Sequence, residues 1–264
     1  MLGLLIFKRK LLATLLAALW AANAVAVFPH VALTPRDDVA PKQATSALLI
    51  NVNTRLGSPE KVSAYIREKK PDFFVLQEVN DDWITLLSSL IATFPHQVVR
   101  TREDNFGLGL FSRHPIVNQF VGNLGDSSVP YIDAELIIET KHLRVITAHT
   151  LPPTSSDYSK VRNHQLIELA NISAQREKPL VLLGDLNVTS FSWHFENFIS
   201  SSGLIDSSEM FGLSPSWPSF LPMMRIQIDH LLHTEDIEIH QKITGPRVGS
   251  DHYPIFTTFT INGD

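Results

Sequence analysis

The sequence contains no cysteine among its 264 residues. This absence excludes disulfide frameworks, structural zinc sites built on thiolates, iron–sulfur clusters and cysteine nucleophiles. Any metal that the chain binds must therefore be held by oxygen and imidazole ligands.

The chain also lacks an excess of positive charge, because its formal net charge is −5. Tight, sequence-independent binding to a nucleic-acid backbone depends on such an excess. The arginines that could hold phosphates are scattered between predicted elements: Arg100, Arg102, Arg113, Arg162, Arg225 and Arg247. This pattern argues against a dedicated DNA-binding protein without excluding a nuclease.

Charge is missing altogether from Leu11 to Leu33, which follow the basic cluster Lys8, Arg9 and Lys10. An apolar helix from Leu11 to about Phe28 covers about 27 Å, close to the hydrocarbon thickness of a bilayer. The segment is typical of an inner-membrane anchor, and its small residues Ala22–Ala26 also fit a cleaved secretory signal. Both interpretations place the rest of the chain outside the cytoplasm, either anchored in the periplasm through residues 11–33 or secreted. A buried core helix is the third alternative, but it has no polar face.

The pattern beyond the apolar run predicts one α/β domain. We expect a membrane or signal segment over 1–33, a linker over 34–45 with Pro35 and Pro41, and a catalytic domain over 46–264. Predicted helices run from Ser58 to Lys70, from Asn80 with Trp83, Leu86, Leu87 and Leu90 inside, over Ser156–Ala174, and over Ser192–Ser200. Predicted strands are Ala47–Val52, Phe73–Leu76, Gln97–Arg100, Leu108–Ser112, Ala134–Glu139, Leu143–Ala148, Pro179–Leu183, Ile226–Leu232 and Ile255–Thr260.

Polar side chains stand directly after several of the apolar strands, where a layered α/β domain presents residues to a ligand. They are Asn51, Glu78, His149, Asp185, Asn187, Asp229, Asp251 and His252. Taken singly, each is typical of a solvated strand end, a turn or a half-buried imidazole. Together they combine the hard oxygen ligands that Mg²⁺ or Mn²⁺ prefers with two imidazoles, which indicates a metal-assisted site.

In chain order these residues lie in short motifs: Leu76-Gln77-Glu78-Val79, Gly109-Leu110-Phe111-Ser112-Arg113-His114-Pro115, Thr147-Ala148-His149, Leu183-Gly184-Asp185-Leu186-Asn187, Ile228-Asp229-His230 and Gly249-Ser250-Asp251-His252-Tyr253-Pro254. The series resembles the endonuclease/exonuclease/phosphatase superfamily over about residues 46–262. Thr150-Leu151-Pro152-Pro153 and Arg162-Asn163-His164-Gln165 further resemble its membrane-anchored bacterial YafD-like group.

The resemblance implies a two-sheet α/β sandwich of the deoxyribonuclease I kind, preceded here by the N-terminal apolar helix. It implies a Mg²⁺ ion, with Mn²⁺ as an alternative, bound by Glu78 with help from Asn51, and Asp251 is assigned to the metal as well. Asp185 would orient the attacking water, while His149 and Asn187 would hold phosphate oxygens, with Arg162 as a further substrate contact. His252 would act as general base or as a phosphate-stabilising imidazolium. Asp229 would orient a neighbouring group or complete the metal's outer shell.

The partner of the His252 ring can be predicted from strand geometry. Adjacent residues of a strand point to opposite faces, so Asp251 is not placed to bond its sequence neighbour. We therefore expect Asp185 or Asp229, arriving from another strand, to lie within about 4 Å of the ring.

Two assignments stay open in the sequence. Asn53 follows Asn51 by two residues and faces the same side of a strand, so the metal-assisting asparagine is either one, with Asn51 preferred. Trp217 and Phe220, among Pro215, Pro218 and Pro222, form an aromatic loop that fits base stacking, lipid contact or a plug at the domain edge.

The function that follows is a metal-dependent hydrolase of phosphoester bonds, acting as a monomer on nucleic acid, a phospholipid head group or a small phosphodiester. The alternative is a membrane-tethered binding module without catalysis. A non-catalytic module would have lost some of the polar site residues by substitution, and none of the key positions is substituted.

Overall fold

The computed structural model describes residues 2–27, 40–175 and 179–262. Its helices are α1 (Leu2–Val27), α2 (Pro59–Lys69), α3 (Asp81–Leu86), α4 (Ser88–Ile91), α5 (Ser156–Ala174), α6 (Trp193–Ser202) and α7 (Ser208–Phe211), with a 3₁₀ turn η2 (Pro222–Met224). Its strands are β1 (Thr45–Asn51), β2 (Phe73–Gln77), β3 (His96–Arg100), β4 (Leu108–Ser112), β5 (Ile116–Asn123), β6 (Pro130–Ile138), β7 (Lys141–Ala148), β8 (Leu180–Asp185), β9 (Ile205–Asp206), β10 (Asp229–His233), β11 (Ile237–Thr244) and β12 (Ile255–Ile261).

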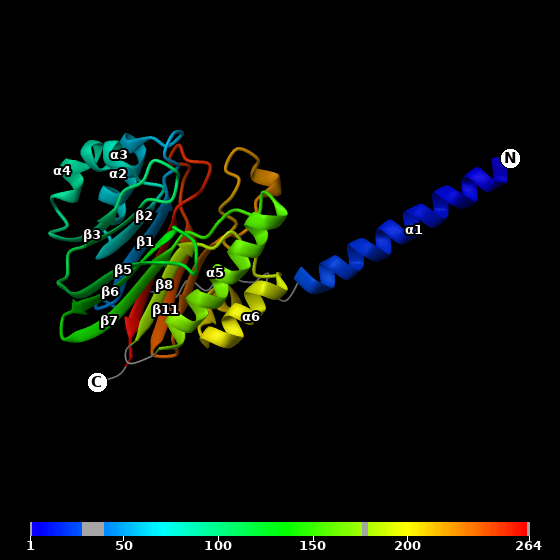
Figure 1. Cartoon of the computed structure of the whole chain (residues 1–264). Helices are drawn as coiled ribbons and strands as arrows, with labels where there is room; N and C mark the ends of the chain where they lie inside the picture. The colour runs from blue at the N-terminus through cyan, green and yellow to red at the C-terminus, as the bar shows by residue number, and fades with distance from the viewer. Residues whose placement is uncertain (1, 28–39, 176–178, 263–264) are drawn as a thin grey trace.

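Within the described residues the strands form two six-stranded sheets, which stack face to face (Figure 1). The first sheet has the order β11-β12-β1-β2-β4-β3, and the second has the order β5-β6-β7-β8-β10-β9. Both sheets are mixed, because β1 pairs in parallel with β2 and β7 pairs in parallel with β8, while the other pairings are antiparallel. The predicted two-sheet α/β sandwich is confirmed.

Three apolar clusters hold the layers together. One lies between the sheets and joins residues such as Leu49, Val75, Val145 and Leu183. The second packs α2, α3 and α4 on the outside of the first sheet, and the third packs α5 and α6 on the outside of the second. Since the central strands are covered on both faces, strands such as β1, β2 and β8 are nearly continuous apolar runs, and the polar residues that end them stand out.

Most element boundaries follow the sequence signals. Ser58 caps α2 by accepting a hydrogen bond from the Lys61 amide at 3.4 Å, and α5 has the predicted bounds Ser156–Ala174. The helix predicted after Asn80 is broken at Leu87 into α3 and α4. Leu86, expected inside, is 63% exposed because the chain turns there.

Strand predictions fail where the apolar pattern is weak. β5 is mostly exposed and mixes apolar and polar residues without strict alternation, and neither β5 nor β11 was predicted. The strand predicted over Ile226–Leu232 begins only at Asp229, because Ile226 instead forms an isolated bridge with Trp217.

The N-terminal helix α1 differs from a predicted membrane span. Among the described residues, no helix is long and apolar enough to cross a membrane. The described side chains of α1, residues 8–22, are all exposed, which removes the alternative of a buried core helix. Residues 28–33 of the predicted segment lie outside the described residues.

Candidate active site

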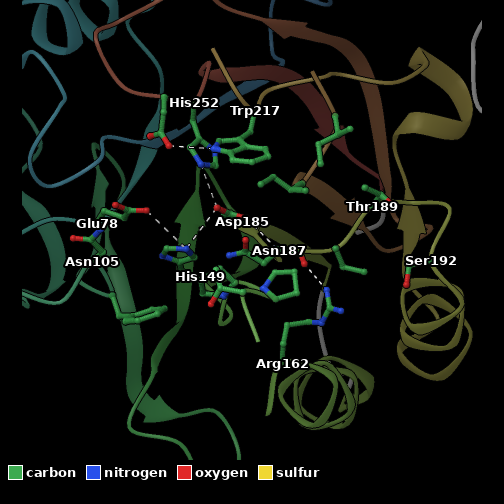
Figure 2. Close-up of a pocket in the computed structure, with 18 residues that line it drawn as sticks. Glu78, Asn105, His149, Arg162, Asp185, Asn187, Thr189, Ser192, Trp217 and His252 are labelled. Atoms are coloured by element: carbon green, nitrogen blue, oxygen red, sulfur yellow. Dashed lines mark hydrogen bonds and ion pairs between the residues drawn. The ribbon is translucent and has the colours of Figure 1, made fainter. Parts of the chain in front are cut away.

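Strand register brings the predicted polar residues to one edge of the sandwich. In the first sheet, Asn51 is level with Gln77 at the ends of β1 and β2. In the second sheet, Asp185 at the end of β8 is directly opposite Asp229 at the start of β10. Because both sheets present these ends at the same edge, side chains far apart in the sequence meet there (Figure 2).

Gln77 joins the two sheets beneath this edge. Its amide nitrogen donates to the Ala148 carbonyl at 2.8 Å, and its amide oxygen accepts from the Asp185 backbone at 3.0 Å. The side chain is fully buried. Gln77 therefore sets the distance between the ends of β2, β7 and β8.

Three of the strand-end residues have left-handed backbone conformations: Asn53 with φ 52°, Glu78 with φ 63° and Asn187 with φ 47°. Such a conformation is uncommon for residues other than glycine and is found at functional sites when the surroundings enforce it. Here it turns the chain sharply after each strand, so that polar groups of the turn face the edge.

His252 lies in the loop between β11 and β12 and reaches across to the second sheet. Its Nδ1 is 2.8 Å from Asp229 Oδ2, and its Nε2 is 3.6 Å from Asp185 Oδ2. Both carboxylates arrive from other strands, so the predicted contact of the ring with Asp185 or Asp229 is confirmed. Ser216 Oγ also donates to Asp229 Oδ2 and holds that carboxylate in place.

The charges of this pair stabilise each other. Burial lowers the pKa of His252, but the charge and hydrogen bond of Asp229, together with Asp185 and Asp251, raise the pKa to about 10. Burial raises the pKa of Asp229, and His252 outweighs it, so the net direction is down. At neutral pH the pair is an imidazolium beside a carboxylate.

Asp185 lies at the centre of the edge and is 1% exposed. Its Oδ2 accepts from Asn51 Nδ2 at 3.3 Å and faces the Nε2 atoms of His149 at 3.5 Å and His252 at 3.6 Å. Burial and the charge of Asp229 raise the pKa of Asp185. A raised pKa makes this carboxylate a better proton acceptor.

His149 is the neutral imidazole of the edge. Burial, followed by the charge of His252, lowers its pKa to about 4. Its Nε2 is 4.0 Å from Glu78 Oε1, and its ring lies 5.2 Å from that of Phe106. His149 therefore offers one hydrogen-bond donor or acceptor without adding charge.

One carboxylate oxygen of Glu78 has no hydrogen-bond partner among the described residues. Asn51 Nδ2 donates to its Oε1 at 2.9 Å, whereas its buried Oε2 has no hydrogen-bond partner. Burial is the largest influence on Glu78 and raises its pKa. Because Asn51 turns its nitrogen toward Glu78, it orients that carboxylate rather than presenting its own oxygen to the same point.

Asp251 lines the same pocket as Glu78 and is held by donors from two segments of the chain. Asn53 Nδ2 donates to its Oδ1 at 2.7 Å, and Trp217 Nε1 donates to its Oδ2 at 3.1 Å. The structure thus places both candidate asparagines at the site, Asn51 on Glu78 and Asn53 on Asp251.

These groups line a pocket of about 560 Å³ (Figure 2). Glu78, His149, Asp185, Asn187, Asp251 and His252 form its polar wall, and Phe106, Pro152, Pro153, Val188, Trp217, Ile226 and Ile228 contribute most of its apolar wall. Arg162 of α5 is the one lysine or arginine among the lining residues in the described part of the chain. Its Nη1 donates to the Asn187 carbonyl, while Asn187 Nδ2 donates to the Thr150 carbonyl at 2.8 Å.

A model of the endonuclease/exonuclease/phosphatase family matches residues 48–252. The chain belongs to this family. A search of curated protein sequences found no significant match.

Solved structures with the fold of this family resemble the chain at low identity. An endonuclease/exonuclease/phosphatase from Beutenbergia cavernae is 20% identical, with a TM-score of 0.68, over 83% of this chain and 72% of that one. D. rerio TDP2, solved with a single-strand DNA product, is 15% identical, with a TM-score of 0.71, over 82% and 99%. The human Nocturnin catalytic domain, solved with a sulfate anion, is 18% identical, with a TM-score of 0.69, over 86% and 98%.

Every residue assigned to the site from sequence lies at this edge of the endonuclease/exonuclease/phosphatase fold, with Asn51 and Asp229 just behind the pocket wall. Gln77, Phe106 and Ser216 were not predicted to take part in the site. Gln77 carried a usable signal, because it is an uncharged polar residue at the end of the apolar run of β2. Phe106 and Ser216 lie in irregular loops with no periodic pattern, so only the folded chain reveals them.

Proposed function

We propose that the protein hydrolyses phosphoester bonds with the help of a divalent cation, by attack of water on phosphorus. The observation that carries this proposal is the meeting, at one pocket, of the Asp229–His252 pair, the Asp185 carboxylate and the unsatisfied oxygen of Glu78. Membership of a family of phosphoester hydrolases supports the same reaction class.

The residues present fit a divalent cation. The carboxylates Glu78, Asp185, Asp229 and Asp251 outnumber the cationic partners, Arg162 and the imidazolium of His252, and the buried Oε2 of Glu78 lacks a donor. Asp185, Asp229 and His252 also offer ligand atoms within 4.8 Å of one another. We prefer Glu78 as a ligand, because its Oε2 lacks a donor, whereas Asp229 and His252 already bond each other at 2.8 Å. Asp251 is the second carboxylate that the family resemblance implies, and its oxygens would be shared with Asn53 and Trp217. A bound Mg²⁺ or Mn²⁺ would neutralise phosphate charge and polarise the ester bond.

Asp185 is the group best placed to orient and deprotonate the attacking water. Its raised pKa favours acceptance of a proton, and its Oδ2 faces the pocket between two imidazoles. As the oxygen–phosphorus bond forms, the water proton passes to Asp185, and the ester bond to the leaving oxygen breaks. His252, held as an imidazolium by Asp229, stabilises the charge that develops on the phosphoryl oxygens. Of the two roles expected for His252, the imidazolium is therefore preferred.

The remaining polar residues position the phosphate. Neutral His149 supplies a hydrogen bond, and Arg162 acts partly through Asn187, whose carbonyl it binds. With an apolar wall and Arg162 as its one lysine or arginine among the described lining residues, the pocket offers no basic track for a long polyanion. D. rerio TDP2 was solved with a single-strand DNA product, which keeps nucleic acid among the substrates to test, with phospholipid head groups and small phosphodiesters.

A substrate screen tests the proposal. The full chain is incubated with Mg²⁺, Mn²⁺ or EDTA and with single-strand DNA, RNA, phospholipid and bis-p-nitrophenyl phosphate. We expect metal-dependent cleavage of at least one substrate, lost in Glu78→Gln. A folded wild-type protein that cleaves none of them would favour the binding module instead.

We further propose that the domain acts outside the cytoplasm as a monomer. The support is the basic cluster Lys8–Lys10 ahead of an uncharged run, and the resemblance of the Arg162-Asn163-His164-Gln165 motif to the YafD-like group. Protease added to intact spheroplasts should digest the domain, and light scattering should give the monomer mass of 29.5 kDa. Complete protection from protease would overturn the location.

A further inference from the structure

Residues 220–226 carry a dense set of exposed apolar side chains. Met223 is 97% exposed and Met224 is 70% exposed, and the set is completed by Phe220, Leu221 and Ile226. Single exposed apolar residues are common, but a contiguous group marks an interaction surface. This segment, with η2 at its tip, is part of the orange loop that projects from the edge of the sandwich (Figure 1).

Hydrogen bonds and a strand bridge hold the base of the segment in place. The loop that exposes these apolar side chains therefore has a defined conformation. Ser219 donates from its backbone to the Asp251 carbonyl at 2.7 Å and from its hydroxyl to the Ser250 carbonyl at 2.7 Å. Trp217 and Ile226 bridge the two ends of the loop, and the Arg225 guanidinium lies 4.7 Å from the centre of the Tyr253 ring. Among the described residues, none covers the side chain of Met223, which is 97% exposed.

The loop stands at the mouth of the candidate active site. Trp217 and Ile226, at its two ends, both line the pocket, and Trp217 also bonds Asp251. Elsewhere on the rim, Ser192 lines the pocket, and its neighbours Phe191 and Trp193 are 37% and 66% exposed. Apolar side chains therefore flank the pocket from two separate parts of the chain.

The charge of the loop identifies the surface that would cover it. Residues 212–228 contain no aspartate or glutamate, and their one charged residue is Arg225. Apolar side chains beside a cation suit a phospholipid surface, where the side chains enter the acyl boundary and the cation stays among phosphates. We propose that residues 220–226 are a membrane-docking loop that inserts Met223 and Met224 into a phospholipid bilayer and sets the pocket against the head groups. The docking proposal does not depend on catalysis. The use of a head-group phosphodiester as substrate, in contrast, rests on the proposed function.

A label at the loop tip tests the docking directly. Because the chain has no cysteine, Met223→Cys in a Glu78→Gln background gives a single site for an environment-sensitive fluorophore. With vesicles of phosphatidylcholine and phosphatidylglycerol we expect a blue shift, and quenching by nitroxide-labelled lipid. Leu86→Cys, an exposed site on α3, is the matched control and should not respond. The fluorophore responds only to its immediate surroundings. Binding of the protein to vesicles through α1 alone would therefore leave its emission unchanged.

No response at position 223 overturns the proposal. A blue shift that follows protein concentration without vesicles also overturns it, because a second copy of the chain then covers the loop.

The enzymatic consequence is tested with Met223→Ser/Met224→Ser against Leu86→Ser. The double variant should lower hydrolysis of vesicle phospholipid on the order of tenfold. Its hydrolysis of soluble bis-p-nitrophenyl phosphate should not change. An equal loss on both substrates would contradict a docking role. If the labelled loop enters vesicles but no phosphoester is cleaved, the docking stands and the proposed function fails.

Discussion

His252 Nδ1 lies 2.8 Å from Asp229 Oδ2, and this contact joins a loop of the first sheet to the first residue of β10 in the second sheet. The carboxylate accepts the Nδ1 proton, fixes the orientation of the ring and keeps the ring charged, with a proton on each nitrogen. The opposite nitrogen then faces Asp185 at 3.6 Å. The site depends on this contact both for its geometry and for its charge.

Asp229→Asn should lower the hydrolysis rate by about 100-fold or more while the protein stays folded. Asparagine keeps the shape of the side chain but removes the charge that holds His252 as an imidazolium. The rate should be measured across pH, and its dependence on the His252 proton should move to lower pH. Ser216→Ala, which removes only a donor to Asp229, should cost much less; an unchanged pH profile in Asp229→Asn would contradict the role of the pair.

The metal-free protein should lose stability as pH rises from about 6.5 to 10. The folded pKa of His252 is raised to about 10, so its contribution is fully present below its unfolded pKa and is lost as pH rises through the folded value. Asp185 acts in the same direction, because its raised pKa means that ionisation destabilises the fold. We expect the melting temperature in EDTA to fall by roughly 5 °C or more over this range.

The same melting curves provide the control for this pH dependence. Asp229→Asn should flatten the decline, because the largest favourable influence on the His252 proton is gone. A wild-type melting temperature that rises between pH 7 and pH 9 would contradict the assignment.

Mg²⁺ or Mn²⁺ should raise the melting temperature of the wild-type protein but not of Glu78→Gln. The substitution removes the negative charge beside the buried, unsatisfied Oε2. Thermal shift against metal concentration measures the effect independently of any substrate. Glu68→Gln is a suitable control, because the Glu68 side chain is 68% exposed and remote from the pocket lining. Equal shifts in both variants would place the metal elsewhere.

Gln77→Leu should destabilise the fold by about 2–4 kcal/mol, because it removes one hydrogen bond each from the buried Asp185 amide and Ala148 carbonyl. Gln97→Leu, at an exposed position of β3, should stay within about 0.5 kcal/mol of wild type. Urea unfolding measures both. A Gln77→Leu protein as stable as Gln97→Leu would show that the two sheets are aligned without this side chain.

The sequence predicted the sandwich and the residues at its edge because both depend on local patterns. Apolar runs such as β2 and β8 end in polar residues, and parallel neighbours bring those ends together. It failed at β5, whose exposed strand lacks an apolar stripe, and at Leu86, where a break between α3 and α4 redirects the side chain. The contacts of Ser216 and Trp217 depend on how a proline-rich loop packs, which no local pattern specifies.

The role of the aromatic loop was left open for a related reason. Sequence shows that Trp217 and Phe220 are close along the chain, but not that one lines the pocket while the other is 58% exposed. That division arises from the bridge between Trp217 and Ile226, which turns the segment outward.

The most direct measurement is the hydrolysis rate of bis-p-nitrophenyl phosphate by the full chain, titrated with Mg²⁺ or Mn²⁺, for the wild type and His252→Gln. The wild type should cleave the ester only with metal present, and His252→Gln should be at least about 100-fold slower with its fold intact. Cleavage by the wild type that is unaffected by EDTA, or that His252→Gln retains in full, would contradict the account.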